Sequence, residues 1–531
     1  MTVSLAGDNT KKRLVAIGNN AVYYEDLAVG AGEWAELTTT GNAIDTSDRL
    51  MMFEAYGKVF VVNGAKLKVA DFQNTKIATA DVGANPPDRG NILTAAGGAA
   101  MIVDYVTALS GAVTIYGYKT TTADFGTEGV TGTDDDGNAI SFTTSGAETA
   151  PPHWYNWTVY GNDTTNYGSM PAKAYIGCLS GGRCILSGNP SYPHQAPTSA
   201  AGNPWDWNTN RTTADRATVI GSGVAGQIGD VVRALIPARD GQLIIGCATS
   251  MHIMIDNPAY GGQMVDINGT GIFDSTSWCF DGDGNLYFWG TGGIYKLAKG
   301  AEQVENLTAT RLPTLITDTG ADPTTHRITM GFDGVRQGIK VCITLLADGT
   351  STNYWLDLQT GGMFPDTHAT AHGVYSIFQY DANATAYKGL LLGCKDGYVR
   401  WHVDTEENDD GTAIDSYVTF GPIALAEDGR DGSIEAFDLI LAGGATGAVD
   451  DATVQVWTED VAETMLEDLI AGTSPQLSMT FTGPGRMRGA KRRRGVRGAF
   501  AGIKIGNSTI SETWGMEKLL IDGGAPGRRL H

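Results

Sequence analysis

A short unit recurs along this chain: a turn that combines Gly with Asp or Asn, then an apolar strand that ends at a second turn. Clear copies surround Gly241, Gly284 and Gly334, and weaker copies surround Gly18 and Gly64. The clear copies follow one another at about 40–50 residues, the repeat length of four-stranded propeller blades. One blade cannot bury its faces alone, so successive blades must pack around a common axis. The pattern therefore predicts an all-β fold built on a β-propeller of six or seven blades.

Composition and charge narrow the classes of protein that fit. The chain has 71 Gly against 18 Pro, a balance typical of short strands joined by tight turns. Its formal net charge is −22 and its pI is about 4.7. Such a surface repels polyanions and lacks the cations that replace condensed counterions on nucleic acid. We expect no ordinary nucleic-acid binding, although DNA would slide past this surface without sticking.

Places where the repeat is interrupted divide the chain into four predicted segments. We expect the first propeller strands in 1–85, an inserted β-rich domain in 86–165 and the remaining blades in 166–405. The loop 189–208 is rich in Pro, which removes backbone donors, so we expect no central strand there. The acidic run that opens 406–531 marks a boundary. Period-two alternation beyond it predicts a C-terminal β-sandwich-like domain with a basic hairpin.

The cysteines and the N-terminus predict a protein that is synthesised and kept reduced in the cytoplasm. No two cysteines form a CxxC pair, and all lie in or beside apolar strands: Cys178, Cys184, Cys247, Cys279, Cys342 and Cys394. We expect buried, reduced thiols that act as small hydrophobic side chains. The N-terminus lacks the basic and apolar regions of a signal peptide, and no apolar run reaches the length of a membrane span. We expect a soluble protein made in the cytoplasm, without membrane insertion.

No motif in the sequence predicts catalysis, a cofactor or a metal. The stretch Asp281-Gly-Asp-Gly-Asn285 has oxygen ligands at alternate positions, but its spacing departs from a calcium loop, and we expect a β-turn. His368 and His372 are four residues apart in a segment flanked by Pro and Gly, where we expect loop residues rather than zinc ligands. Neither a nucleophile elbow nor a phosphate-binding GxxxxGK[ST] loop occurs. We expect that the protein is not an enzyme, with no catalytic, cofactor-binding or metal residues.

One stretch reverses the sign of charge in this acidic chain. Its basic residues are Arg486, Arg488, Lys491, Arg492, Arg493, Arg494 and Arg497. We expect them to form a docking surface for an acidic neighbouring subunit or adaptor. Contact with DNA phosphate is the weaker form of this reading, because no aromatic residues are interleaved for base stacking. The alternative is an exposed hairpin that neutralises carboxylates of the same chain.

Several sequence blocks carry a resemblance to a known family. The block 189–192, with Asn-Pro-Ser-Tyr, precedes 203–208, with Asn-Pro-Trp-Asp-Trp-Asn. Strand units at 232–246 and 285–295 follow, and the chain ends in Arg-rich segments. Over roughly residues 170–531, this arrangement resembles the tail nozzle proteins of short-tailed bacteriophages, also called tail hub or tail tubular protein B-like proteins.

The resemblance implies a structural protein of the virion. It implies a homo-oligomer, a hexameric ring that continues the DNA channel below the adaptor and holds it closed until genome ejection. The partners it implies are the phage adaptor (head-to-tail connector) protein and tail fibre or spike proteins. It also implies that double-stranded DNA passes through the lumen without sequence-specific binding. The implied location is the virion tail, and the host cytoplasm during assembly.

Two other functions stay open. The first is a receptor- or glycan-binding β-propeller of a phage fibre or surface protein, in which exposed aromatics would stack on sugars. The aromatic residues are Trp154, Trp157, Trp205 and Trp207. If they pack beneath the Pro-rich loop instead, they are not available to bind sugars. The second is a hydrolase on a propeller scaffold, which a fold alone does not imply. A trimer would favour a fibre protein and a hexamer a nozzle.

Overall fold

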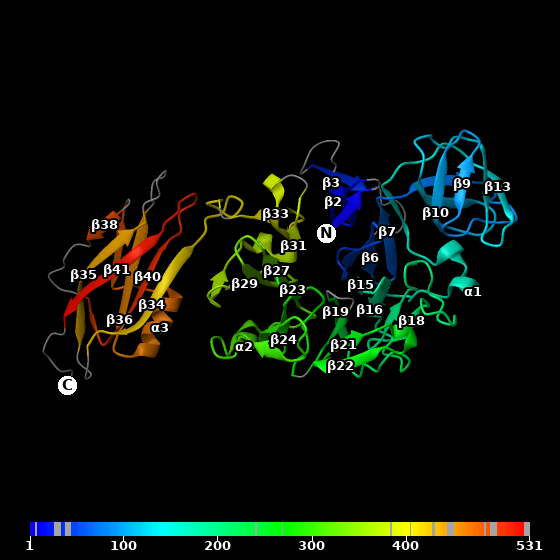
Figure 1. Ribbon diagram of the computed structural model, residues 1–531. Coiled ribbons are helices and arrows are strands. Elements are labelled where there is room, and N and C mark those ends of the chain that lie inside the picture. Colours follow the sequence, from blue (N-terminus) through cyan, green and yellow to red (C-terminus); the bar gives the residue numbers. More distant parts are fainter. Residues whose placement is uncertain are drawn as a thin grey trace. The chain divides into compact units, whose positions relative to one another are not determined.

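The computed structural model describes residues 1–5, 8–25, 33–37, 44–238, 242–267, 269–382, 385–403, 405–426, 431–442, 451–482, 485–488 and 496–524. It divides into two compact units. The first comprises Met1–Asp366 and Thr370–His402, and the second Thr367–Ala369 and Val403–His531. Antiparallel strands dominate both units (Figure 1).

Within the described part of the first unit, seven sheets outside one insertion follow one another along the chain. Blade 1 contains β1 (Thr2–Leu5), β2 (Asp8–Gly18), β3 (Ala21–Glu25) and β4 (Trp34–Leu37). Blade 2 contains β5 (Met51–Ala55), β6 (Lys58–Asn63), β7 (Lys66–Asp71) and β14 (His153–Asn156). Blade 3 contains β15 (Ile176–Ser180), β16 (Arg183–Ser187), β17 (Ala196–Thr198) and β18 (Thr218–Ile220).

Blades 4 to 6 repeat this four-stranded plan, and blade 7 has three described strands. Blade 4 contains β19 (Val232–Pro237), β20 (Leu243–Cys247), β21 (Met251–Ile255) and β22 (Gln263–Ile267). Blade 5 contains β23 (Trp278–Phe280), β24 (Leu286–Gly290), β25 (Gly293–Leu297) and β26 (Val304–Asn306). Blade 6 contains β27 (His326–Asp333), β28 (Gly338–Leu345), β29 (Ser351–Asp357) and β30 (Met363–Asp366). Blade 7 contains β31 (Val374–Tyr380), β32 (Gly389–Cys394) and β33 (Val399–His402).

The ring closes between blade 7 and blade 1. Leu14 of β2 packs against Tyr380 of β31. The Tyr380 hydroxyl donates a hydrogen bond to the carboxylate of Glu25. Lys12 forms an ion pair with Asp381, with 3.2 Å between Nζ and Oδ2. The predicted β-propeller is therefore confirmed, and its described sheets make seven blades around one axis (Figure 1).

In blades 2 to 7, the first strand lies nearest the axis. β15 contacts β5 on one side and β19 on the other, and β27 likewise contacts β23 and β31. Successive first strands can be neighbours in this way only at the inner edge of the ring. Because these strands enter the ring in the same direction, the residues that begin them gather at one mouth of the central channel.

The insertion is a six-stranded antiparallel sheet between β7 and β14. Its strands are β8 (Thr75–Thr79), β9 (Ile92–Ala95), β10 (Ala100–Val106), β11 (Val113–Lys119), β12 (Gly129–Thr133) and β13 (Ala139–Thr143). They are arranged in the order β13-β12-β9-β10-β11-β8. A bridge between Thr79 and Thr144 links the two edges, so that the sheet closes on itself.

The insertion starts and ends earlier than the predicted range 86–165. β8 already belongs to it, and β14 has returned to blade 2, where His153 pairs with Asp71. This pairing joins residues more than eighty positions apart, and such a contact leaves no local pattern in the sequence.

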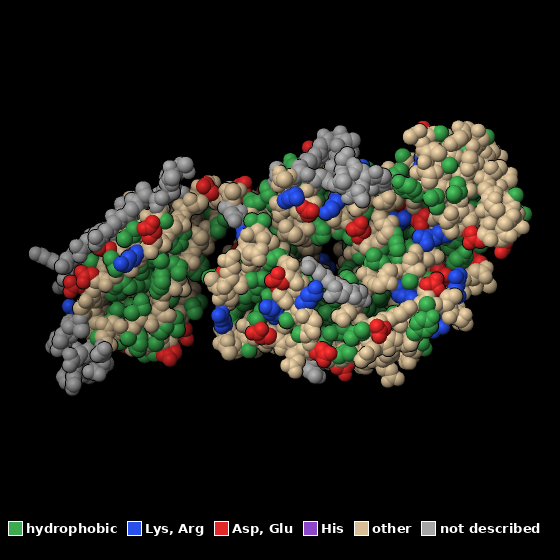
Figure 2. Space-filling view, viewed as in Figure 1, with side chains coloured by type: hydrophobic (Ala, Val, Ile, Leu, Met, Phe, Trp, Pro, Cys, Tyr) green, Lys and Arg blue, Asp and Glu red, His purple; other side chains and the backbone are tan. Residues whose placement is uncertain are grey.

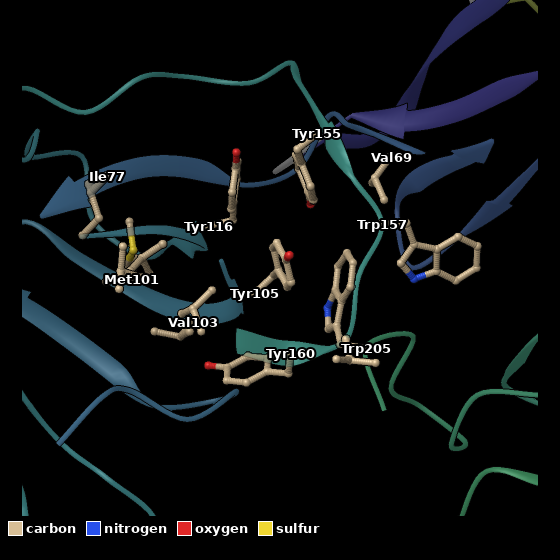
Figure 3. Close-up of a cluster of buried hydrophobic side chains, with 14 of the residues drawn as sticks. Val69, Ile77, Met101, Val103, Tyr105, Tyr116, Tyr155, Trp157, Tyr160 and Trp205 are labelled. Atoms are coloured by element: carbon tan, nitrogen blue, oxygen red, sulfur yellow. The ribbon is translucent and has the colours of Figure 1, made fainter. Parts of the chain in front are cut away.

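A shared aromatic core holds the insertion on the propeller (Figure 3). Tyr105 of β10 stacks on Trp205, which follows β17, with ring centroids 4.3 Å apart. Tyr116 of β11 stacks on Tyr155 of β14 at 4.2 Å. The rings of Tyr105 and Tyr155 are nearly parallel, 5.4 Å apart. Side chains from the insertion, blade 2 and blade 3 therefore form one continuous stack.

The expectation of no central strand in 189–208 is wrong. β17 contains Pro197 and lies between β16 and β18. It forms a single register pair with β16, between Ile185 and Thr198. Because so little of this side of β17 is paired, the N–H that Pro197 lacks is not missed.

The second unit is a two-layer β-sandwich, as predicted. One sheet has the order β34 (Ser416–Ala424), β40 (Phe500–Asn507), β36 (Ala452–Glu459) and β37 (Leu477–Phe481). In the other, β38 (Gly485–Arg488), β39 (Val496–Gly498) and β41 (Met516–Gly524) all pair with β35 (Gly432–Leu441). Phe437 and Leu439 of β35 share a buried core with Val454 of β36 and Ile503 of β40. The helix α3 (Ala462–Ala471) packs Met465 against Trp457 of β36.

Short helices occur only in connections of the described chain. They are α1 (Thr164–Tyr167), α2 (Leu315–Thr319), η1 (Tyr160–Asn162), η3 (Pro258–Tyr260), η4 (Thr370–His372) and η5 (Thr385–Tyr387). The repeat turn at Asp240-Gly241 lies outside the described residues, whereas the turns before β24 and β28 lead into the predicted strands.

Candidate functional site

The predicted basic surface is described in part. Arg486 and Arg488 lie in β38, opposite Ile440 and Asp438 of β35. Arg497 is exposed in β39 and lies opposite Ser433, near the other end of β35. Lys491 and Arg492 to Arg494 lie outside the described residues. One strand thus receives both ends of the basic stretch, while its docking role stays a prediction.

The Asp281 motif, which resembled a calcium loop, is a turn closed by its own side chains. Asp281 Oδ1 accepts hydrogen bonds from the N–H groups of Asp283 (2.9 Å) and Asn285 (2.8 Å). Its Oδ2 accepts from the Asn285 amide at 2.7 Å. A second acidic turn, at Asp134, is closed in the same way, because its carboxylate accepts from the backbone and side chain of Asn138. These carboxylates therefore shape the turns, as expected for a β-turn.

The tryptophans proposed for sugar stacking do not form a surface. Trp205 is fully buried, and Trp157 and Trp207 are each 3% exposed. Trp157 and Trp207 both donate from Nε1 to the carbonyl of Pro204, each at 3.0 Å. Trp154 packs against the core between blades 1 and 2. Trp157, Trp205 and Trp207 are therefore buried at the Pro-rich loop, and these three side chains are not available to stack on sugars.

All six cysteines are buried and free, as predicted. Within the described ranges, no group of three or more His, Cys, Asp or Glu side chains could hold a metal ion. Among the helices that the structure describes, none has the length and apolar character needed to cross a bilayer.

Charged and aromatic residues from four blades meet where the innermost strands begin. Arg49 precedes β5 of blade 2, and Asp274 precedes β23 of blade 5. Arg327 and Tyr375 are the second residues of β27 and β31, in blades 6 and 7. We call these four residues the channel mouth.

Arg49 reaches across the propeller axis. Its Nη2 donates to the carbonyl of Pro323 at 2.6 Å, and its Nη1 lies 3.9 Å from Asp274 Oδ1. Blade 2 is three blades away from both blade 5 and blade 6, so these contacts span the channel. The loop that carries Arg49 is held by buried Asn63, whose amide donates to the carbonyls of Asp45 (3.1 Å) and Arg49 (2.8 Å).

Arg327 lies beside the same carboxylate. Its guanidinium carbon is 5.0 Å from the centroid of the Tyr375 ring. Burial lowers the pKa of Arg327 because it disfavours the charged form. The negative charge of Asp274 works against this shift, and the positive charge of Arg49 adds to it. Asp274 is placed here because Thr276 donates from Oγ1 to the β27 carbonyl of Ile328 at 2.8 Å. No motif in the sequence marks these residues; the available signal is that polar residues recur at the starts of first strands.

One side of the sandwich in the second unit is apolar. β34 and β41 are edge strands within the described part of this unit, and they expose Tyr417, Leu520 and Ile521. Phe420 and Leu519, from the same strands, pack against the core and stay half-exposed. Figure 2 shows hydrophobic side chains gathered on the face of this unit that carries β34 and β41 in Figure 1. We call this surface the sandwich flank.

Comparisons with known proteins identify no family for this chain. No family model and no curated protein matches the sequence. Among solved structures, an extracellular domain of a hybrid two-component system from Bacteroides thetaiotaomicron is 11% identical, with a TM-score of 0.31; the match covers 71% of this chain and 45% of that one. A Bacteroides fragilis protein described as a 6-phosphogluconolactonase is 12% identical, with a TM-score of 0.35, over 75% of this chain and 92% of that one. The tricorn protease is 11% identical, with a TM-score of 0.24, over 75% and 41%.

Proposed function

We propose that this chain is a structural subunit of a ring, the tail nozzle of a short-tailed phage. The observation that carries the proposal is the sandwich flank. Edge strands with unpaired backbone groups and exposed apolar side chains are templates for pairing with another chain. Exposed apolar patches likewise mark interaction surfaces on soluble proteins. A ring of identical subunits would cover the flank at each repeated, heterologous contact.

In this proposal the propeller forms part of the wall of the ring, and DNA does not pass through the propeller's own central channel. Arg49 spans the channel inside each propeller, so DNA in this proposal passes between subunits, through the lumen of the ring. The net charge of −22 per chain would make that lumen repel DNA, which then slides without binding. The basic stretch would meet an acidic neighbour or the adaptor.

The experiment that tests the proposal is electron microscopy of the protein mixed with the portal–adaptor complex, with no symmetry imposed. We expect a six-fold ring that caps the adaptor. A trimer, or a monomer that ignores the adaptor, would contradict the nozzle proposal and favour a peripheral binding propeller.

Reversing the charge of Arg492, Arg493 and Arg494 to Glu should block ring or adaptor assembly, because an acidic partner would then be repelled. The monomer should stay folded, as judged by circular dichroism. The same change at Lys173, Lys299 and Lys388, exposed lysines of the propeller, should leave assembly intact. Normal assembly of the arginine variant would rule out this docking role.

A second prediction concerns the sandwich flank itself. Leu520→Glu adds a charge at a position that is already 39% exposed, so the monomer should keep its thermal stability. Assembly should fall sharply if β41 is covered in the ring, because the carboxylate would be buried without a partner. Sedimentation velocity with the adaptor measures the effect, and Ile510→Glu, at another exposed apolar residue of the unit, is the matched control.

A further inference from the structure

We propose that the channel mouth binds a small oxyanion, a carboxylate or a phosphate, between Arg49 and Arg327. The site goes beyond the nozzle function and does not depend on it, because every residue that forms it belongs to one propeller.

The first argument is unsatisfied donor capacity. The guanidinium of Arg327 has no hydrogen bond or ion pair with any residue that the structure describes; its neighbour is the face of the Tyr375 ring. Arg49 uses Nη2 on the Pro323 carbonyl, whereas its Nη1 is 3.9 Å from Asp274, too far for a hydrogen bond. Two guanidinium groups thus keep donors for an acceptor that the described residues do not supply.

The second argument is local charge. The charged groups that act on Arg327 are Asp274, which is one anion, and Arg49, which is a second cation. The nearby carboxylate of Asp48 is engaged by the hydroxyl of Tyr175 at 3.0 Å. Asp322 accepts from the backbone and the hydroxyl of Thr324. Neither of these two carboxylates is among the charges that act on Arg327, so two guanidinium groups face one carboxylate there, and one further negative charge would balance them.

The third argument is access and shape. The side chain of Arg49 is 50% exposed and that of Asp274 is 14% exposed, so the mouth is open to solvent on the Arg49 side. The planar fork of a guanidinium matches the oxygens of a carboxylate or phosphate and binds them through two parallel hydrogen bonds. The stacked Tyr375 ring leaves the edge of Arg327 available for that pairing.

Isothermal titration calorimetry with sodium phosphate and, separately, sodium acetate tests the site, with sodium chloride at equal ionic strength as the reference. We expect saturable binding of one anion per chain in at least one arm. Tighter acetate binding would identify a carboxylate site, and tighter phosphate binding a phosphate site.

Two variants should change the affinity in opposite directions. Arg327→Gln should weaken binding by about tenfold, because it removes a charge-assisted pair of hydrogen bonds. Asp274→Asn should strengthen it several-fold, because it removes the carboxylate that competes for both arginines. Arg400→Gln, at a guanidinium already paired with both oxygens of Asp396, is the control and should bind as the wild type does.

Heats equal to those of chloride, or the same affinity in both mouth variants, would overturn the proposal. Near-ultraviolet circular dichroism of each variant shows whether the propeller is intact. If Arg327→Gln does not fold, the increase expected for Asp274→Asn still decides the question. Ring assembly is read out separately, so its failure would leave this result unchanged.

Discussion

Replacing Asp104 by Ala should lower the free energy of unfolding of the first unit by about 3–5 kcal/mol. Asp104 lies in β10 of the insertion and forms an ion pair with Lys58 of β6, 2.9 Å between Oδ2 and Nζ. It also accepts from Arg89 Nε at 3.0 Å and from the Asn74 amide at 3.0 Å. The side chain of Lys58 is only 4% exposed, and two carboxylates, those of Asp71 and Asp104, act on its positive charge. Removal of Asp104 therefore leaves the buried ammonium group with Asp71 alone. Urea unfolding followed by tryptophan fluorescence measures the loss.

The same network predicts how the stability depends on pH. Burial alone would raise the pKa of Asp104, but Lys58 and Arg89 outweigh it and hold the pKa at about 2. An unfolded Asp has a pKa of about 4. The stabilisation is therefore complete above about pH 4 and is lost as the pH falls through about 2. The Asp104→Ala variant should lack this part of the acid transition.

Asp124 provides the matched control. It lies in the same insertion and forms an ion pair with Lys119, but its side chain is 80% exposed. Asp124→Ala should change stability little, because solvent screens an exposed pair. Equal losses in the two variants would show that the Asp104 network does not hold the insertion on blade 2.

Replacing Trp205 by Ala should have a similar effect, a loss of about 3–5 kcal/mol. Trp205 is fully buried and stacks on Tyr105, and its ring also lies 6.0 Å from that of Phe60. Its removal would open a cavity where the insertion, blade 2 and blade 3 meet (Figure 3). Thermal unfolding by circular dichroism measures the change.

Tyr192→Ala is the control for the tryptophan variant. Tyr192 belongs to the same Pro-rich loop and is 55% exposed. Its truncation should shift the free energy of unfolding by no more than about 0.5 kcal/mol. If both variants unfold at the same temperature as the wild type, the aromatic stack does not stabilise the junction.

The local part of the fold could be predicted from the sequence. The turn at Gly284 leads into β24 and that at Gly334 into β28, because a tight turn and the strand beside it are encoded within about ten residues. The alternation in 436–441 likewise predicts β35 of the sandwich. The burial of the six cysteines followed from their apolar neighbours.

The boundaries of the insertion could not be predicted in this way. β14 pairs with β7 across the whole inserted sheet, and no pattern in 72–152 announces that return. The sequence also could not predict whether the tryptophans are buried or exposed. Trp205 and Trp157 are buried because Tyr105, Tyr155 and Phe60 come from three distant segments to cover them.

The sequence by itself determined the class of fold, because a blade is built from contacts between neighbours along the chain. It also determined the acidic character and the basic stretch, which are sums over residues. Only the tertiary structure decided that the described sheets make seven blades, because closure of the ring depends on the contact between Leu14 and Tyr380. The tertiary structure alone also places Arg49 beside Asp274 and Arg327. In a closed ring, residues from opposite blades meet at the channel mouth however far apart they are in the sequence.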